Sequence, residues 1–177
     1  MTTSLPGRPE ATEFAPFYAG YIAAVPDGDI RHIVREGREE LAAMFSGIPE
    51  ARGDYRYAEG KWSVKTVMGH LIDAERIFSY RALRLARGDK TPLPGFEENA
   101  YAITAASDAR TVADLASEML DVRTSTIRLF DSIPDDAWDR TAMVSVGEVS
   151  VRALAYIIVG HARHHLNVLR ERYGIGE

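Results

Sequence analysis

Apolar residues recur every three or four positions along four long segments of the chain, the spacing at which one face of an α-helix repeats. We therefore predict four long helices, at residues 29–46, 63–87, 111–132 and 150–172. Each begins at a residue whose side chain can cap the free amide groups of a first helical turn: Asp29, Ser63, Thr111 and Ser150. A residue that commonly ends helices follows each segment: Gly47, Gly88, Pro134 and Gly174. Four apolar stripes buried against one another predict an all-α fold, a four-helix bundle.

The segments outside these helices show weaker patterns. Residues 1–28 are rich in proline, glycine and aromatic side chains, and we predict an N-terminal arm with a short helical turn near residues 16–24. Residues 29–177 are then expected to form one bundle domain. Between the second and third helices, residues 89–110 are predicted to be a long loop of functional importance. Weak alternation over residues 143–149 predicts a short extended turn and no sheet.

Composition and charge exclude several classes of protein. The chain has 177 residues, enough for one domain of ordinary size, and a formal net charge of -5, which disfavours nucleic-acid binding. It contains no cysteine, which excludes disulfides, thiolate metal ligands and a cysteine nucleophile. No segment reaches the ~20 apolar residues of a membrane span, and the start of the sequence lacks the pattern of a secretory signal. We therefore expect a cytoplasmic protein without membrane or nucleic-acid partners.

Histidines near two of the apolar stripes are the strongest candidates for chemistry. His161 and His165 are four positions apart on the fourth predicted helix and share the stripe that contains Ile158. His70 lies at the margin of the stripe on the second predicted helix, next to Ala74. Helices present two imidazoles to one metal ion at this four-residue spacing, and three nitrogen ligands would leave a coordination position open. From spacing alone, metal binding and ordinary packing both remain open.

Other polar residues lie near these histidines. Asp73, one turn beyond His70, is a candidate for orienting a ligand or holding a catalytic water, or is an ordinary polar residue at the stripe edge. His164 falls on the flank of its helix, ~100° from His165, and is not expected to be a ligand. Arg81 and Arg84 lie within ~40° of the direction of His70. They either bind a carboxylate or phosphate of a substrate at the mouth of the bundle, or pair with acidic residues on a solvated face.

Several stretches of the sequence resemble the DinB superfamily of four-helix proteins. They are residues 61–65 with 69–76, residues 80–84 with 87–89, and residues 151–154 with 160–165. The resemblance extends from Phe17 to Tyr173 and implies an up-down-down-up bundle, often assembled as a homodimer. It also implies that His70, His161 and His165 bind a divalent metal ion, with nickel or zinc the expected metals.

The resemblance is less specific about the reaction. Members of the family include S-transferases that use bacillithiol or mycothiol, a mycothiol-dependent maleylpyruvate isomerase, and proteins described as metal-dependent hydrolases. Our working hypothesis is a metal-dependent transferase with a small-molecule substrate and a low-molecular-weight thiol as cosubstrate, because the chain has no thiol of its own. The alternatives are a metal-dependent hydrolase and a non-enzymatic, metal-binding stress-response protein with a small-ligand pocket.

Overall fold

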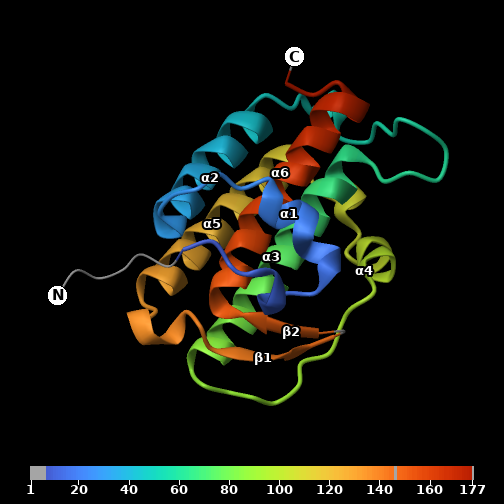
Figure 1. Cartoon of the computed structure of the whole chain (residues 1–177). Coiled ribbons are helices and arrows are strands. Elements are labelled where there is room, and N and C mark those ends of the chain that lie inside the picture. Colours follow the sequence, from blue (N-terminus) through green and yellow to red (C-terminus); the bar gives the residue numbers. More distant parts are fainter. Residues whose placement is uncertain (1–6, 146, 177) are drawn as a thin grey trace.

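The computed structural model describes residues 7–145 and 147–176 and shows a bundle of four long helices with shorter elements packed around it (Figure 1). The long helices are α2 (Ile30–Ser46), α3 (Val64–Ala86), α5 (Val112–Asp131) and α6 (Val151–Tyr173). All four predicted capping side chains accept a hydrogen bond from a backbone amide in the first turn. The predicted all-α bundle is therefore confirmed. Within the described residues, no helix combines the length and the apolar character that a membrane span needs.

The long helices follow the predicted up-down-down-up order. In Figure 1, α2 and α6 run in one direction along the bundle, and α3 and α5 run in the opposite direction. Both α3 and α2 pack against α5 and α6. The neighbours α3 and α5 are thus parallel, which requires the chain to return along the whole bundle between them. Residues 87–111 make this return, which explains why that connection is long.

The connection between α3 and α5 is more ordered than the long loop that the sequence predicted. It contains the helix α4 (Glu98–Thr104) and a 3-10 turn at Ser107–Ala109. The carboxylate of Glu97 caps α4 by accepting hydrogen bonds from the backbone amides of Asn99 and Ala100. A helix of two turns is too short to produce a repeating apolar stripe, so the pattern analysis missed it.

A small hairpin replaces the extended turn that was predicted near residues 143–149. The strands β1 (Thr141–Val144) and β2 (Gly147–Ser150) pair in antiparallel register, and Leu93 forms an isolated parallel bridge to Val144. Strands of four residues alternate too few times to be distinguished from a turn. The prediction that the chain contains no sheet was therefore wrong in this segment, although the two strands are a minor part of the fold.

The N-terminal arm is built into the bundle. It forms two 3-10 turns, Ala11–Glu13 and Pro16–Tyr18, and the short helix α1 (Ala19–Ala23), which packs against α6. Ile22 of this arm is buried within the core. Phe17, by contrast, is 71% exposed. The arm therefore contributes both to the core and to the surface around the site described below.

Buried polar residues interrupt the apolar core halfway along the bundle. One apolar cluster includes Phe78, Phe130 and Ile158, and the other includes Leu71, Met119 and Leu166. Between them, Arg123 of α5 donates two hydrogen bonds of 2.7 Å to the carboxylate of Glu75 on α3. Both side chains are almost fully buried, and a Cβ atom at Gly37 of α2 would lie 2.6 Å from Nη1 of Arg123. On α6 this boundary falls at His161, and the ring of His70 on α3 lies against it.

Candidate metal centre

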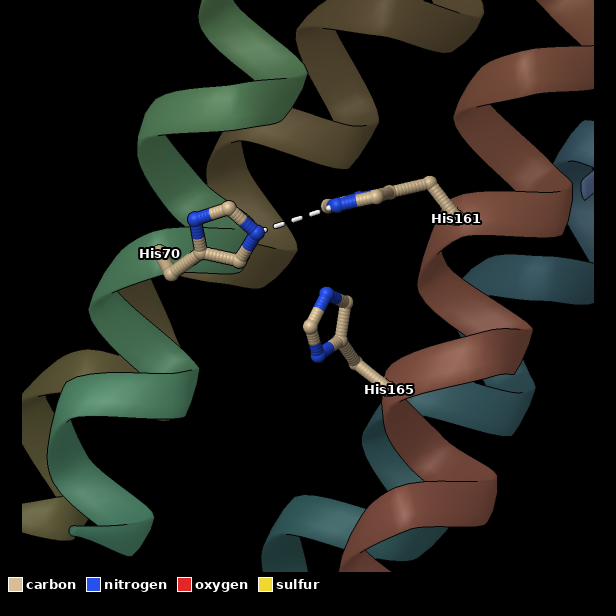
Figure 2. A group of neighbouring side chains, drawn as sticks. All are labelled: His70, His161 and His165. Carbon is tan, nitrogen blue, oxygen red and sulfur yellow. Dashed lines mark hydrogen bonds between the residues drawn. The ribbon is translucent and has the colours of Figure 1, made fainter. Parts of the chain in front are cut away.

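Three histidines meet between α3 and α6. His70 projects from α3, and His161 and His165 project from successive turns of α6 into the same space (Figure 2). The Nε2 atoms of His70 and His161 are 3.0 Å apart, and one ring nitrogen from each of the three histidines lies within 4.8 Å of the other two. The structure thus brings together the three residues that the family resemblance implies as ligands.

Glycines bring other segments close to this cluster. A Cβ atom at Gly160 would lie 1.9 Å from the backbone carbonyl oxygen of Tyr21, so α1 packs directly on the backbone of α6. A Cβ atom at Gly69 would lie 2.0 Å from Oγ of Ser107, in the turn that precedes α5. Each of these glycines directly precedes a histidine of the cluster. The absence of their side chains therefore allows the walls of the site to approach the histidines.

Burial keeps the three imidazoles neutral. His70 and His161 are each 5% exposed, and His165 is half-buried. Loss of hydration lowers the pKa of His70 to about 4 and the pKa of His165 to about 3. The pKa of His161 falls well below its ordinary value, first because of burial and then because the neighbouring histidines would repel its charge. At neutral pH all three rings therefore offer nitrogen lone pairs.

The donor set fits a divalent ion. Neutral imidazole is a good ligand for zinc, nickel, copper and iron. Zinc binds histidine nitrogens at ~2.0–2.1 Å, so two such ligands in a tetrahedral site are ~3.3 Å apart. The 3.0 Å between Nε2 of His70 and Nε2 of His161 is close to that separation. Small rotations of the side chains would bring the third ring into range.

Aromatic side chains surround the cluster. The ring of Trp62 lies 4.9 Å from that of His70, and the rings of Tyr21 and Phe78 lie 5.3 Å and 5.7 Å from that of His161. These aromatic residues could not be placed at the site from the sequence, because their positions give no sign of which segments fold over α6. Gly160 was the available signal, since a glycine inside a helix often marks a close approach of another backbone.

Two cavities reach the histidines. The first has a volume of about 300 Å³ and is bounded by α1, α3 and the connection after α3, with His70 and His161 in its wall. The second has a volume of about 260 Å³ and is bounded by residues 57–62 and the C-terminal half of α6, with His165 in its wall. The three histidines that would hold one ion therefore line two different cavities.

The two predicted arginines have different surroundings. Arg81 is 3% exposed, lies in the wall of the first cavity and donates a 2.9 Å hydrogen bond to the carbonyl oxygen of Pro94. Arg84 lies outside the walls of both cavities and donates hydrogen bonds to Asp89 and to the hydroxyl of Tyr80. The ion pair that sequence analysis considered for both arginines is thus present at Arg84.

Asp73 and His164 also lie outside the walls of both cavities. Burial raises the pKa of Asp73, and the charged residues that influence it are Arg76, Glu118 and Arg110. Its role in catalysis stays a prediction. His164 is exposed to solvent, and its ring lies 5.5 Å from that of Tyr21.

Comparison with known families and proteins gives a consistent assignment. The family model described as the DinB superfamily matches residues 33–169. The chain belongs to the DinB superfamily. Two curated relatives of this DinB-superfamily protein are both named "putative metal-dependent hydrolase". The relative from Bacillus mycoides is 28% identical over 75% of this chain and 79% of its own length. The relative from Geobacillus thermodenitrificans is 29% identical over 80% of this chain and 82% of its own length.

Solved structures confirm the fold. YfiT from Bacillus subtilis, described as "a probable metal-dependent hydrolase with an unusual four-helix bundle topology", superimposes with a TM-score of 0.72 at 17% identity. The match covers 95% of this chain and 94% of YfiT. A mycothiol-dependent maleylpyruvate isomerase matches with a TM-score of 0.64 at 13% identity, over 83% of this chain and 60% of the isomerase. At such identities the likeness establishes the shared bundle and not the reaction.

Proposed function

We propose that this protein is a divalent-metal-dependent transferase that uses a low-molecular-weight thiol as cosubstrate, with nickel or zinc as the metal. The observation that carries the proposal is the position of the histidine cluster between two cavities. A transferase must hold two molecules at one reacting centre, and each cavity can hold one of them. The chain contains no cysteine, so the thiol has to come from outside the protein.

The chemistry follows from the neutral ligands. A divalent ion held by three uncharged imidazoles keeps its full charge, and such an ion lowers the pKa of a thiol or water in its open position. His70 and His161 line the first cavity and His165 lines the second, so these three side chains would hold the ion within reach of a molecule in either cavity. The apolar rings of Trp62 and Phe78 lie 4.9 Å from His70 and 5.7 Å from His161, which reduces the space for water beside these two histidines. In the overall reaction the thiol sulfur bonds to an electrophilic carbon, a leaving group departs with its electron pair, and the thiol proton passes to solvent.

A metal-dependent hydrolase is the second candidate, because both curated relatives carry that name. In a hydrolase the nucleophile would be water, and the substrate would be an ester or an amide. A non-enzymatic metal-binding protein is the third candidate. A cytoplasmic location, a homodimer and a separation of the chain into residues 1–28 and 29–177 also stay predictions. A monomeric mass by light scattering at micromolar concentrations would contradict the homodimer.

The deciding experiment compares the two reactions on one preparation. Protein loaded with nickel or zinc is given a panel of small thiols with an activated aryl halide, and separately an activated ester without thiol. We expect thiol transfer that is lost on chelation and in His161→Ala, and retained in the matched control His164→Ala. Metal-dependent ester cleavage without thiol would favour the hydrolase, and tight metal binding with neither reaction would favour the non-enzymatic protein. Asp73→Asn tests the predicted catalytic role, which requires a lower kcat with metal retained.

A further inference from the structure

We propose that Arg81 forms a carboxylate-binding subsite in the first cavity, and that this cavity takes a small molecule with an apolar or aromatic body and one carboxylate group. This inference deepens the proposed function. It rests on that function for the assignment of the histidine cluster as the reacting end of the cavity.

The positive charge of Arg81 is buried without a negative partner. Its guanidinium group donates to the carbonyl oxygen of Pro94, and among residues 7–145 and 147–176 no carboxylate forms an ion pair with it. Two other arginines of the bundle do have acidic partners: Arg123 is paired with Glu75, and Arg84 is paired with Asp89. A buried charge that lacks a counter-charge costs free energy. A ligand carboxylate in the adjoining cavity would supply that counter-charge.

Arg81 and the histidine cluster lie at two ends of one aromatic wall. The guanidinium carbon of Arg81 is 5.7 Å from the centre of the Phe78 ring and 5.9 Å from that of Phe96. The Phe78 ring is itself 5.7 Å from the ring of His161. A ligand held by Arg81 would therefore lie along Phe78 and extend towards the histidines. The cavity volume of about 300 Å³ is at the small end of ligand pockets, which fits a molecule of this kind.

The charge of the cavity favours a carboxylate over a phosphate. Glu97 and Glu98 lie in the same wall as Arg81, so the cavity already contains two acidic groups for one guanidinium. A phosphate monoester carries nearly two negative charges at neutral pH and would be repelled more strongly than a carboxylate. The planar fork of an arginine matches the oxygens of a carboxylate and of a phosphate alike, so the preference rests on the charge of the cavity. Five aromatic residues supply half of the remaining lining residues: Phe17, Tyr18, Tyr21, Phe78 and Phe96.

The test uses three probes that share one aromatic body: 3-phenylpropionate, its neutral amide 3-phenylpropionamide, and 2-phenylethyl phosphate. Affinities are measured by calorimetry on metal-loaded protein and again after chelation, because a carboxylate can also bind a metal ion. We expect the carboxylate to bind at least about tenfold more tightly than the amide, the scale of a charge-assisted hydrogen-bond pair. This preference should persist after chelation. It should disappear in Arg81→Gln and remain in the matched control Arg84→Gln, one turn further along α3.

Several outcomes would overturn the subsite. These are equal affinity for carboxylate and amide, no binding of the carboxylate at millimolar concentration, a preference that vanishes on chelation, and tighter binding of the phosphate. Circular dichroism establishes that Arg81→Gln is folded, and Arg81→Lys, which keeps the charge, should retain part of the preference. If Arg81-dependent binding is present without thiol transfer, the transferase fails and the subsite stands. If transfer occurs without Arg81-dependent binding, the subsite alone fails.

Discussion

The Nε2 atoms of His70 and His161 face each other at 3.0 Å, although the two residues are 91 positions apart in the chain. In the metal-free protein this contact requires one ring to donate a proton and the other to accept it. Both rings are buried and neutral, and His165 adds a third nitrogen on the same side. Replacing the shared proton by a cation would satisfy all three rings at once.

We expect each chain to bind one divalent ion, and we expect His70→Ala, His161→Ala and His165→Ala each to remove it. The loss should exceed the roughly 10–100-fold that the removal of a supporting partner costs at metal sites, because a direct ligand is lost. Elemental analysis of protein purified without a metal-binding tag measures the stoichiometry. His164→Ala is the matched control and should retain the ion. Retention in His165→Ala together with loss in His164→Ala would reverse the assignment.

The metal-free protein should lose stability as the pH falls from about 6.5 towards 4. The pKa of His70 in the folded protein is about 4, below its ordinary value of 6.5, so the unfolded chain binds more protons between these two values. The free energy of unfolding therefore decreases as the pH is lowered through this window. Above about pH 6.5, His70 is neutral in both states and does not change the free energy of unfolding. Urea denaturation at pH 7 and pH 5 measures the change. Carboxylates contribute mainly at lower pH, and His70→Gln should show a smaller difference between the two values.

Gly160→Ala should destabilise the protein more than Gly69→Ala. The added Cβ would meet a backbone carbonyl oxygen of Tyr21 at 1.9 Å, whereas at Gly69 it would meet the hydroxyl of Ser107, which can rotate away. Overpacking of this kind costs typically 1–3 kcal/mol. Thermal unfolding compares the two variants with the parent protein. Gly160→Ala should also weaken metal binding, because α1 and the ring of Tyr21 would move away from His161. An unchanged melting temperature for Gly160→Ala would show that α1 does not pack as described.

Removing one member of the Glu75–Arg123 pair should be more damaging than replacing both. Arg123 is 0% exposed and Glu75 4% exposed, so a single replacement leaves a buried charge without its partner. Such changes cost about 3–5 kcal/mol, whereas apolar replacement of a whole buried pair is often neutral. We expect Glu75→Leu to unfold at much lower urea concentration than the parent, and Glu75→Leu combined with Arg123→Met to recover most of the loss. Additive effects of the two replacements would contradict this interpretation.

The long helices and the histidine cluster could be predicted because both depend on repeating positions. Apolar spacing located α2, α3, α5 and α6, and the four-residue interval placed His161 and His165 on one face. That His70 joins this pair was implied by the family resemblance. Helical spacing alone does not say which faces of two helices meet.

The rest depended on contacts that no local pattern encodes. Arg81 and Arg84 project from the same side of α3, but their partners differ. The connection after α3 folds over Arg81, which donates to the carbonyl oxygen of Pro94, whereas Arg84 pairs with Asp89. Arg123 was not foreseen in the core, since a charged residue in an amphipathic helix is ordinarily on the solvated side. Its burial requires both the carboxylate of Glu75 and the space at Gly37, which lie on two other helices.

The separation of the histidines along the chain also bears on when a metal ion can enter. During synthesis His70 leaves the ribosome long before His161 and His165, which belong to the last long helix. An isolated imidazole on α3 offers a cation one ligand, and the contact between α3 and α6 is non-local, so it can form only after α6 has been synthesised. Metal uptake would therefore follow the docking of α6. Metal would then enter folded chains only, and a bound ion would identify the chains in which α6 has docked against α3.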